Sequence, residues 1–201
     1  MKKHCEFPDL RVDLDNAITY GTLKSAAAIA KDGLRQAQSK GFPAEAEYFL
    51  AQQDIIKKRF TSAIEHLDKA IKGNPLDGAA YNDRALCMVE LGIIDEAIGY
   101  FDKGIAAEPD YATVYHNKGW LLNNIGRHSE AIEYFRKALE LEPKRPVTYD
   151  NLADALYNLG DSRGALMAYK KVLSLLKPRS CPGIRKEIAG KIQLLERELS
   201  S

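Results

Sequence analysis

Residue types that support catalysis occur together at few places in this chain. His128-Ser129-Glu130 contains the residue types of a hydrolytic triad, but consecutive side chains cannot converge as a triad requires. We interpret this segment as the start of a helix, with the Ser129 hydroxyl accepting a backbone N–H. The sequence has no Gly-rich phosphate loop followed by Lys and no HExxH motif. It therefore predicts a protein that is not an enzyme.

Cysteine and histidine give no pattern typical of a metal site. The three cysteines, Cys5, Cys87 and Cys181, are far apart and odd in number, which favours reduced thiols. His4-Cys5 supplies at most half of a metal site. We expect no metal and no cofactor.

Bulk composition narrows the protein class. Hydrophobic residues make up 45% and charged residues 28%, and the formal net charge is +1, which fits a folded chain with no general attraction to nucleic acid. No apolar run is long enough for a signal peptide or a membrane span. We expect a soluble cytoplasmic protein that binds no nucleic acid and does not insert into a membrane.

The sequence repeats itself every 34 residues. Six columns keep this step: Ala63, Ala97, Ala131 and Ala165; Leu67, Phe101, Phe135 and Tyr169; Pro75, Pro109 and Pro143; Gly92, Gly126 and Gly160; Tyr81, Tyr115 and Tyr149; and Ala51, Ala85, Gly119 and Ala153. Such agreement indicates a repeat architecture, whose units stack because one unit cannot bury its apolar face alone.

Each unit is predicted to be a pair of helices. In the unit at 112–145, Gly126 supplies the left-handed residue that ends the first helix. Two helices approach closely only where one offers Gly or Ala, so we expect Gly119 to contact Ala131. Phe135 fills the space beside that contact.

These columns resemble the tetratricopeptide repeat (TPR). The resemblance implies an all-α fold, a right-handed superhelical solenoid of antiparallel helix pairs. It predicts four units, a divergent helical pair or cap before them and a capping helix after them, with these boundaries: 44–77, 78–111, 112–145 and 146–179, preceded by 1–43 and followed by 180–201. The first unit departs from the pattern at Glu47 and Lys58, and Lys177 replaces the last proline.

The family resemblance implies that a second face of each first helix lines a concave groove for partner peptides. The residues that it assigns to this peptide-binding groove are Tyr48, Phe49, Gln52, Asn82, Asp83, Leu86, His116, Asn117, Trp120, Asn124, Asp150, Asn151 and Asp154. In some family members an Asn column clamps the partner's backbone amides, and Asn117 and Asn151 occupy such a column here. The alternative is that these are ordinary surface residues and that Trp120 packs against a neighbouring repeat or the terminal helix.

The groove positions are acidic although the whole chain is nearly neutral. Five carboxylates and no Lys or Arg occupy these columns: Glu45, Asp83, Glu90, Asp150 and Asp154. A basic or polar partner would complement them, while the alternative is a solvated face. Family members that bind the carboxyl-terminal tails of heat-shock chaperones do so through a clamp of Lys, Arg and Asn side chains. The matching positions here hold no cation, in either register: Tyr48, Gln52, Asp83, Thr113 and Asn117, or Asn82, Leu86, Asn117, Val147 and Asn151.

The sequence leaves three functional readings open. The first is an adaptor that binds a peptide or protein segment in the groove. The second is a self-assembling scaffold, and the third is an accessory subunit of an enzyme complex. Concentration-dependent size distinguishes the second from the first.

Overall fold

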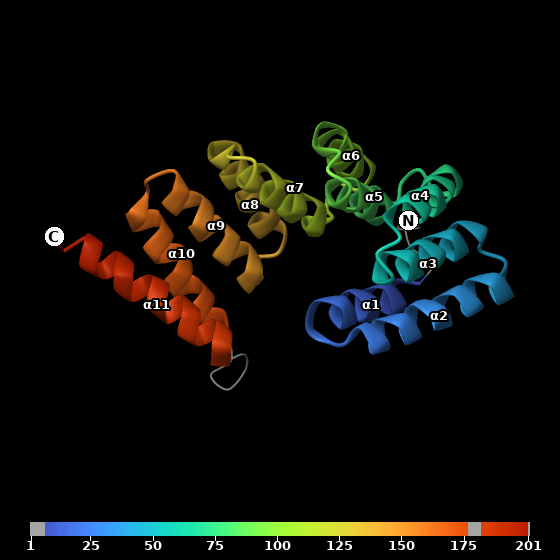
Figure 1. The fold of residues 1–201 in the computed structure, drawn as a ribbon, viewed down its shortest axis with the longest axis horizontal. Coiled ribbons are helices and arrows are strands. Elements are labelled where there is room, and N and C mark those ends of the chain that lie inside the picture. Colours follow the sequence, from blue (N-terminus) through green and yellow to red (C-terminus); the bar gives the residue numbers. More distant parts are fainter. Residues whose placement is uncertain (1–6, 177–181, 201) are drawn as a thin grey trace. The chain divides into compact units, whose positions relative to one another are not determined.

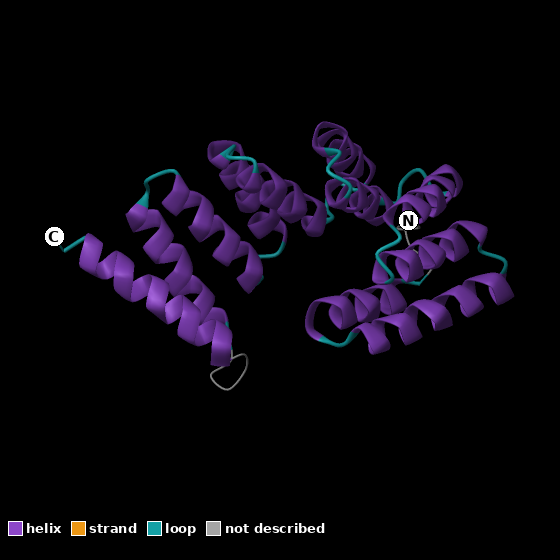
Figure 2. Ribbon diagram, viewed as in Figure 1, coloured by secondary structure: helices purple, strands orange, loops and turns teal. Residues whose placement is uncertain are grey.

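The computed structural model describes residues 7–176 and 182–200. The His4-Cys5 pair, Cys181 and Lys177 lie outside the described residues. Helices joined by short loops make up nearly all of the described chain (Figures 1 and 2). In chain order these helices are α1 (Pro8–Tyr20), α2 (Leu23–Lys40), α3 (Pro43–Ile56), α4 (Phe60–Gly73), α5 (Gly78–Glu90), α6 (Ile94–Ala107), α7 (Ala112–Asn124), α8 (His128–Leu141), α9 (Pro146–Asn158), α10 (Ser162–Leu175) and α11 (Pro182–Glu198).

The helices group into two compact units, each of which contains more than one of the predicted repeats. The first unit runs to Pro109 and contains α1–α6, and the second begins at Asp110 and contains α7–α11. Within each unit, consecutive helices pack as antiparallel pairs, and each second helix also contacts the first helix of the next pair, as α4 contacts α5 and α8 contacts α9. The predicted all-α fold of sequential helix pairs is confirmed.

The α7–α8 pair depends on a glycine. A Cβ added to Gly119 would lie 2.9 Å from the ring of Phe135 and 3.2 Å from the carbonyl oxygen of Ala131. No larger residue fits without moving one helix away from the other. The expected contact of Gly119 with Ala131 and Phe135 is therefore present.

The other columns of small and aromatic residues fill equivalent places. Ala63, Ala97, Ala131 and Ala165 are fully buried, and so are Leu67, Phe101 and Phe135. On α8 the buried residues Ala131, Phe135 and Ala138 follow a helical period, while Glu133 and Arg136 are exposed. The repeat columns are thus the packing positions of the helix pairs.

The turn inside each pair requires one left-handed residue. Gly92, Gly126 and Gly160 have φ values of 77°, 82° and 90°. Lys58 holds the same position in the predicted repeat at 44–77. Its φ of 57° is the one positive φ of a non-glycine residue in the described chain. The departure seen in the sequence therefore changes the residue without changing the turn.

One local expectation was wrong. α8 begins at His128 after Arg127, and no side chain caps its first turn, so the Ser129 hydroxyl does not accept a backbone N–H there. Arg127 instead forms an ion pair with Glu130 at 2.6 Å, and His128 Nδ1 lies 2.6 Å from Asn123 Oδ1. These contacts place charges and amides where the cap was expected.

The flanking segments also form helices that pack on the repeats. At the amino-terminal end, α1 packs on α2 and α2 packs on α3, where Gly33 lies against the ring of Phe49. At the other end, α11 packs on α10 and buries Ile188, Ile192 and Leu195. None of the helices in the described ranges has the length and apolar character needed to cross a membrane.

We predict that Phe135→Ala lowers the free energy of unfolding by about 3–5 kcal/mol, because it leaves a cavity beside Gly119. Urea unfolding followed by circular dichroism measures this change. Glu133→Ala, an exposed substitution on the same helix, is the control and is expected to change stability by less than about 0.5 kcal/mol. Wild-type stability of Phe135→Ala would contradict the packing role.

We predict that Lys58→Gly raises the free energy of unfolding by about 1 kcal/mol, because a non-glycine residue in the left-handed region is strained. The measurement is again urea unfolding. Lys57→Gly is a matched control, because Lys57 has φ −89° and gains nothing from glycine. Equal effects of the two substitutions would show that φ at Lys58 is not the cause.

Candidate functional site

In the first compact unit, hydrogen bonds to Asp83 join α3 and α5, the first helices of two neighbouring pairs. We call the side of these first helices that carries the predicted groove residues the first-helix face. Tyr48 Oη donates to Asp83 Oδ2 at 3.0 Å and Gln52 Nε2 donates to the same oxygen at 2.5 Å. Asn82 Nδ2 donates to Oδ1 at 3.0 Å. Burial raises the pKa of Asp83 to about 6; these donors oppose the shift and the carboxylate of Asp15 adds to it. The face is therefore a connected polar layer between α3 and α5.

Glu45, at the start of the same face, is neutralised by a cation from α1. Arg11 Nε and Nη2 donate to the two carboxylate oxygens of Glu45 at 3.2 and 3.0 Å. The same guanidinium pairs with Asp77. The columns of the four predicted repeats hold no cation, but at Glu45 the flanking helix α1 supplies one.

In the second unit a buried histidine joins α7 to α9. His116 is 7% exposed, and its Nδ1 lies 3.0 Å from Thr148 Oγ1. Its Nε2 lies 3.5 Å from Asn151 Nδ2, so the amide donates to Nε2 and the ring proton sits on Nδ1. Burial lowers the pKa of His116 to about 3, with Arg145 adding to the shift. His116 is therefore neutral and orients Asn151.

The carboxylates of α9 also have a cation. Lys191 Nζ of α11 lies 3.0 Å from Asp154 Oδ1 and 3.6 Å from Asp150 Oδ1. Tyr169 Oη donates to Asp154 as well. Burial raises the pKa of Asp150, and Lys191 opposes that shift. Here too a flanking helix supplies the cation that the groove columns lack.

The predicted groove residues differ in accessibility. Five are buried and serve as internal supports: Tyr48, Phe49, Gln52, Asn82 and His116. Phe49 is the clearest case, since it is fully buried against Gly33 of α2 and presents nothing to a ligand. The partly or fully accessible ones are Asp83, Leu86, Asn117, Trp120, Asn124, Asp150, Asn151 and Asp154. Of these, Asn117, Trp120, Asn124, Asp150, Asn151 and Asp154 belong to the second unit.

Three residues that bond to the predicted groove residues were absent from the sequence prediction: Arg11, Lys191 and Thr148. Arg11 stands one period of 34 before Glu45, so extending the columns by one unit would have found it. Lys191 stands 37 residues after Asp154, which is out of register with the repeat. Treating both ends as caps hid Arg11 and Lys191, whereas Thr148 lies inside the repeat at 146–179 and carries no distinctive sequence signal.

A separate polar cluster fills the α3–α4 pair. His66 Nδ1 lies 2.6 Å from Glu47, and its Nε2 lies 3.9 Å from Asp54. Ser62 Oγ and Arg59 also donate to Asp54. Ser62 and His66 thus meet the same carboxylate rather than each other, so the cluster is not a nucleophile–base pair. Within the described ranges no group of three or more His, Cys, Asp or Glu is placed to hold a metal ion.

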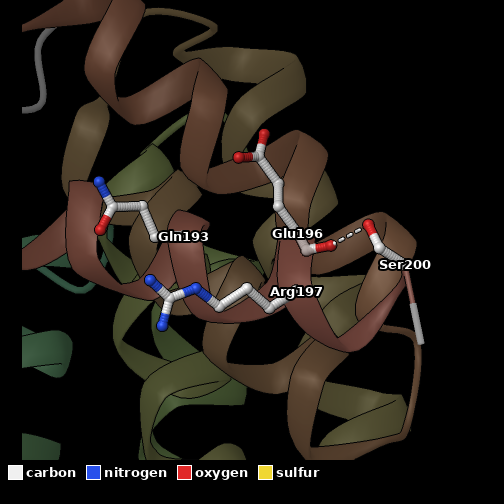
Figure 3. A pocket seen from close by; sticks show the side chains of 4 residues that line it. All are labelled: Gln193, Glu196, Arg197 and Ser200. Carbon is white, nitrogen blue, oxygen red and sulfur yellow. Dashed lines mark hydrogen bonds between the residues drawn. The ribbon is translucent and has the colours of Figure 1, made fainter.

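A depression lies on the surface at the carboxyl-terminal end of α11. Gln193, Glu196, Arg197 and Ser200 line it (Figure 3). Ser200 Oγ donates to the backbone oxygen of Glu196 at 2.6 Å. The depression is open and lined by exposed side chains, which is unlike an enclosed small-molecule site.

Comparison with known families gives a clear result. Three family models described as tetratricopeptide repeat match residues 57–112, 112–145 and 147–177, which together are more than half of the chain. The chain belongs to the tetratricopeptide-repeat family. TPR folds are typically non-catalytic and generally act as protein-interaction modules. No curated protein matches the sequence.

Solved structures share the TPR fold. TTC0263, a thermophilic TPR protein of Thermus thermophilus, has a TM-score of 0.73 at 20% identity and covers 94% of this chain and 100% of its own. MamA has a TM-score of 0.62 at 22% identity, covering 81% and 93%. The first TPR of Spaghetti (RPAP3), bound to the HSP90 peptide SRMEEVD, has a TM-score of 0.55 at 20% identity, covering 62% and 94%. These identities establish a common fold alone.

We predict that His116 makes stability of this TPR protein fall as pH drops. Its pKa is about 3 in the folded chain against an ordinary 6.5, so the unfolded chain binds the additional proton. Stability from this group is full above about pH 6.5 and declines toward pH 3, by at most about 1.4 kcal/mol per pH unit. Urea unfolding of wild type and His116→Gln between pH 4 and 8 isolates the difference. An identical pH slope in both proteins would contradict it.

Proposed function

We propose that this protein is a non-enzymatic adaptor that binds an extended peptide or partner segment on the first-helix face of its second unit, formed by α7 and α9. The observation that supports this most directly is that Asn117 and Asn151 occupy the same repeat column, one period apart. Trp120 lies one helical turn after Asn117. All three side chains are partly accessible. The family membership supports the general role of protein interaction.

The amide of Asn151 suits a backbone clamp. One of its N–H groups points to His116 Nε2, which leaves the carbonyl oxygen and the other N–H for a ligand. An amide both donates and accepts, so it matches a peptide unit. Because His116 is neutral and buried, this long hydrogen bond favours one orientation of Asn151 before a partner arrives, which reduces the entropy lost on binding.

Trp120 suits an anchoring contact. It is partly exposed on a face whose other members are amides and carboxylates, and aromatic residues are enriched among the residues that dominate binding energy. The alternative from the sequence is that Trp120 packs against a neighbouring repeat or the terminal helix, which concerns only the buried part of its side chain. The exposed part remains available to a partner.

The charge of this face favours a polar or basic partner, though less strongly than the sequence alone predicted. Lys191 offsets part of the charge of Asp150 and Asp154. Glu187, 3.8 Å from Lys191, keeps the cluster negative overall. The peptide bound by the RPAP3 repeat, SRMEEVD, carries three acidic residues. Since the clamp positions here hold no cation, we expect this chain to disfavour such a tail.

We predict that Trp120→Ala weakens binding of a selected peptide by about 2 kcal/mol or more, and Asn151→Ala by about 1–2 kcal/mol. A peptide library selected on the full chain supplies the ligand, and calorimetric titration at two salt concentrations measures affinity. Weaker binding at higher salt is expected for a basic peptide.

Gln38→Ala, which truncates an exposed amide on α2, is the matched control and should leave affinity unchanged. Binding that survives both Trp120→Ala and Asn151→Ala would place the site elsewhere. Selection of no peptide, with size increasing with concentration, would favour the scaffold function. Selection of no peptide by a monomer that co-purifies with one enzyme would favour the accessory subunit.

A further inference from the structure

Helix α1 contacts the repeats differently from the other first helices. Elsewhere the side-chain bonds between first helices join residues about one period apart, such as Tyr48 with Asp83, 35 apart, and His116 with Asn151, also 35 apart. Arg11 of α1 also reaches Asp77, 66 residues away at the start of α5. Arg11 thus reaches past α3 to the next first helix of the unit.

The guanidinium of Arg11 is bound by two carboxylates and by the face of an aromatic ring. Its Nη1 and Nη2 donate to the two oxygens of Asp77 at 2.9 and 2.7 Å, in addition to the two bonds to Glu45 at 3.2 and 3.0 Å. The guanidinium carbon lies 3.6 Å from the centre of the Tyr48 ring. Only 10% of the Arg11 side chain is exposed, with 6% for Glu45 and 5% for Asp77. We call Glu45, Tyr48 and Asp77 the arginine pocket.

Two walls of the arginine pocket, Asp77 and Tyr48, are held by contacts that do not involve α1. Asp77 caps α5 by accepting the backbone N–H of Ala80 at 3.1 Å. Tyr48 is anchored through its hydroxyl to Asp83 at 3.0 Å. A planar fork can satisfy both carboxylates while stacking on a ring, whereas an ammonium cannot. These two walls therefore keep their positions without α1, and the pocket as a whole is selective for a guanidinium.

Apart from Arg11, α1 is held through one apolar face. Phe7 and Leu14 are buried and Leu10 and Ala17 partly buried on that face, whereas Val12 is 59% exposed and Ile18 44% exposed. No side chain caps the first turn of α1. Asp15 adds a repulsive carboxylate near Asp83 of α5. A terminal helix held by one apolar face and one ionic anchor has fewer contacts to break than a helix packed on both sides, so it can open locally.

We propose that α1 is a displaceable occupant of the first unit, and that the arginine pocket binds an arginine of a partner's amphipathic helix when α1 leaves. The side of α1 that faces the unit shows what fits there: Phe7, Leu10, Arg11 and Leu14, at positions i, i+3, i+4 and i+7. A partner helix with apolar residues at i, i+3 and i+7 and arginine at i+4 presents the same chemistry. This site lies in the first unit and is separate from the proposed peptide site of the second.

A peptide with the sequence of residues 7–20, added to the whole 201-residue chain, tests the proposal. Arg11→Gln removes the anchor of the resident helix, so this variant of the chain should bind the peptide at least about ten-fold more tightly than wild type, since losing one member of a buried charge pair has a large effect. The same peptide carrying Arg11→Gln should not bind. Adding Glu45→Gln to the variant should reduce the affinity at least about ten-fold.

Two control variants separate this site from other effects. Arg35→Gln removes an exposed arginine of α2 that pairs with Asp32 and should leave peptide binding at the wild-type level. Trp120→Ala in the Arg11→Gln background should leave binding unchanged, so a failure of the second unit's peptide site does not affect this result. Absence of binding to a folded Arg11→Gln chain would overturn the proposal.

Hydrogen exchange of the wild-type chain decides the matter if the variant does not fold. Amides of α1 should exchange faster than those of α3 and α4. Saturating peptide should speed exchange in α1 further and slow it at the start of α5. Exchange of α1 as slow as that of α3 and α4, and unaffected by peptide, would show that α1 is a fixed helix of the array.

Discussion

The close approach of two helices at a residue without a side chain is the constraint on which this structure depends. At Gly119 the backbone of α7 comes so near α8 that an added Cβ would meet both the Phe135 ring and a backbone oxygen. This approach buries Phe135 completely and fixes the rotation of α7 about its axis. Once that rotation is fixed, the faces of the helix have assigned roles: one face packs in the pair, and another carries Asn117 and Trp120 away from it.

Polar bonds between first helices form a second layer of order. Apolar packing is nondirectional, but hydrogen bonds set register. Asp83 receives donors from Tyr48 and Gln52, and His116 bridges Thr148 and Asn151. The buried members of this layer hold the accessible members in place. Several side chains that the repeat columns assign to the ligand face are therefore buried and bond to a neighbouring helix instead.

The two flanking helices complete the electrostatics of the repeats. Arg11 from α1 and Lys191 from α11 pair with carboxylates of α3, α5 and α9, which would otherwise repel one another along their faces. Each flanking helix therefore acts both as a cover for apolar surface and as a counterion for its own unit. The two contacts differ in kind, because Arg11 is enclosed by two carboxylates and a ring while Lys191 stays partly exposed.

The sequence by itself determined the helix pairs, their turns and their packing positions. These follow from local rules: a period that recurs, small residues where helices touch, and glycine where φ is positive. The same rules make Lys58 conspicuous, because it occupies a column that glycine fills in the other units. The wrong prediction of a Ser129 cap is also local in origin, because α8 begins at His128 and Ser129 therefore lies inside its first turn.

Only the tertiary structure decided which residues of the first-helix face are accessible and how they are charged. Burial of Phe49 depends on α2, and the charge balance at Glu45 and Asp154 depends on helices outside the matched repeats. The physical reason is that burial and electrostatics are set by whatever packs nearby, regardless of sequence distance. A column specifies the direction in which a side chain leaves its own helix, but it does not specify what lies across from it.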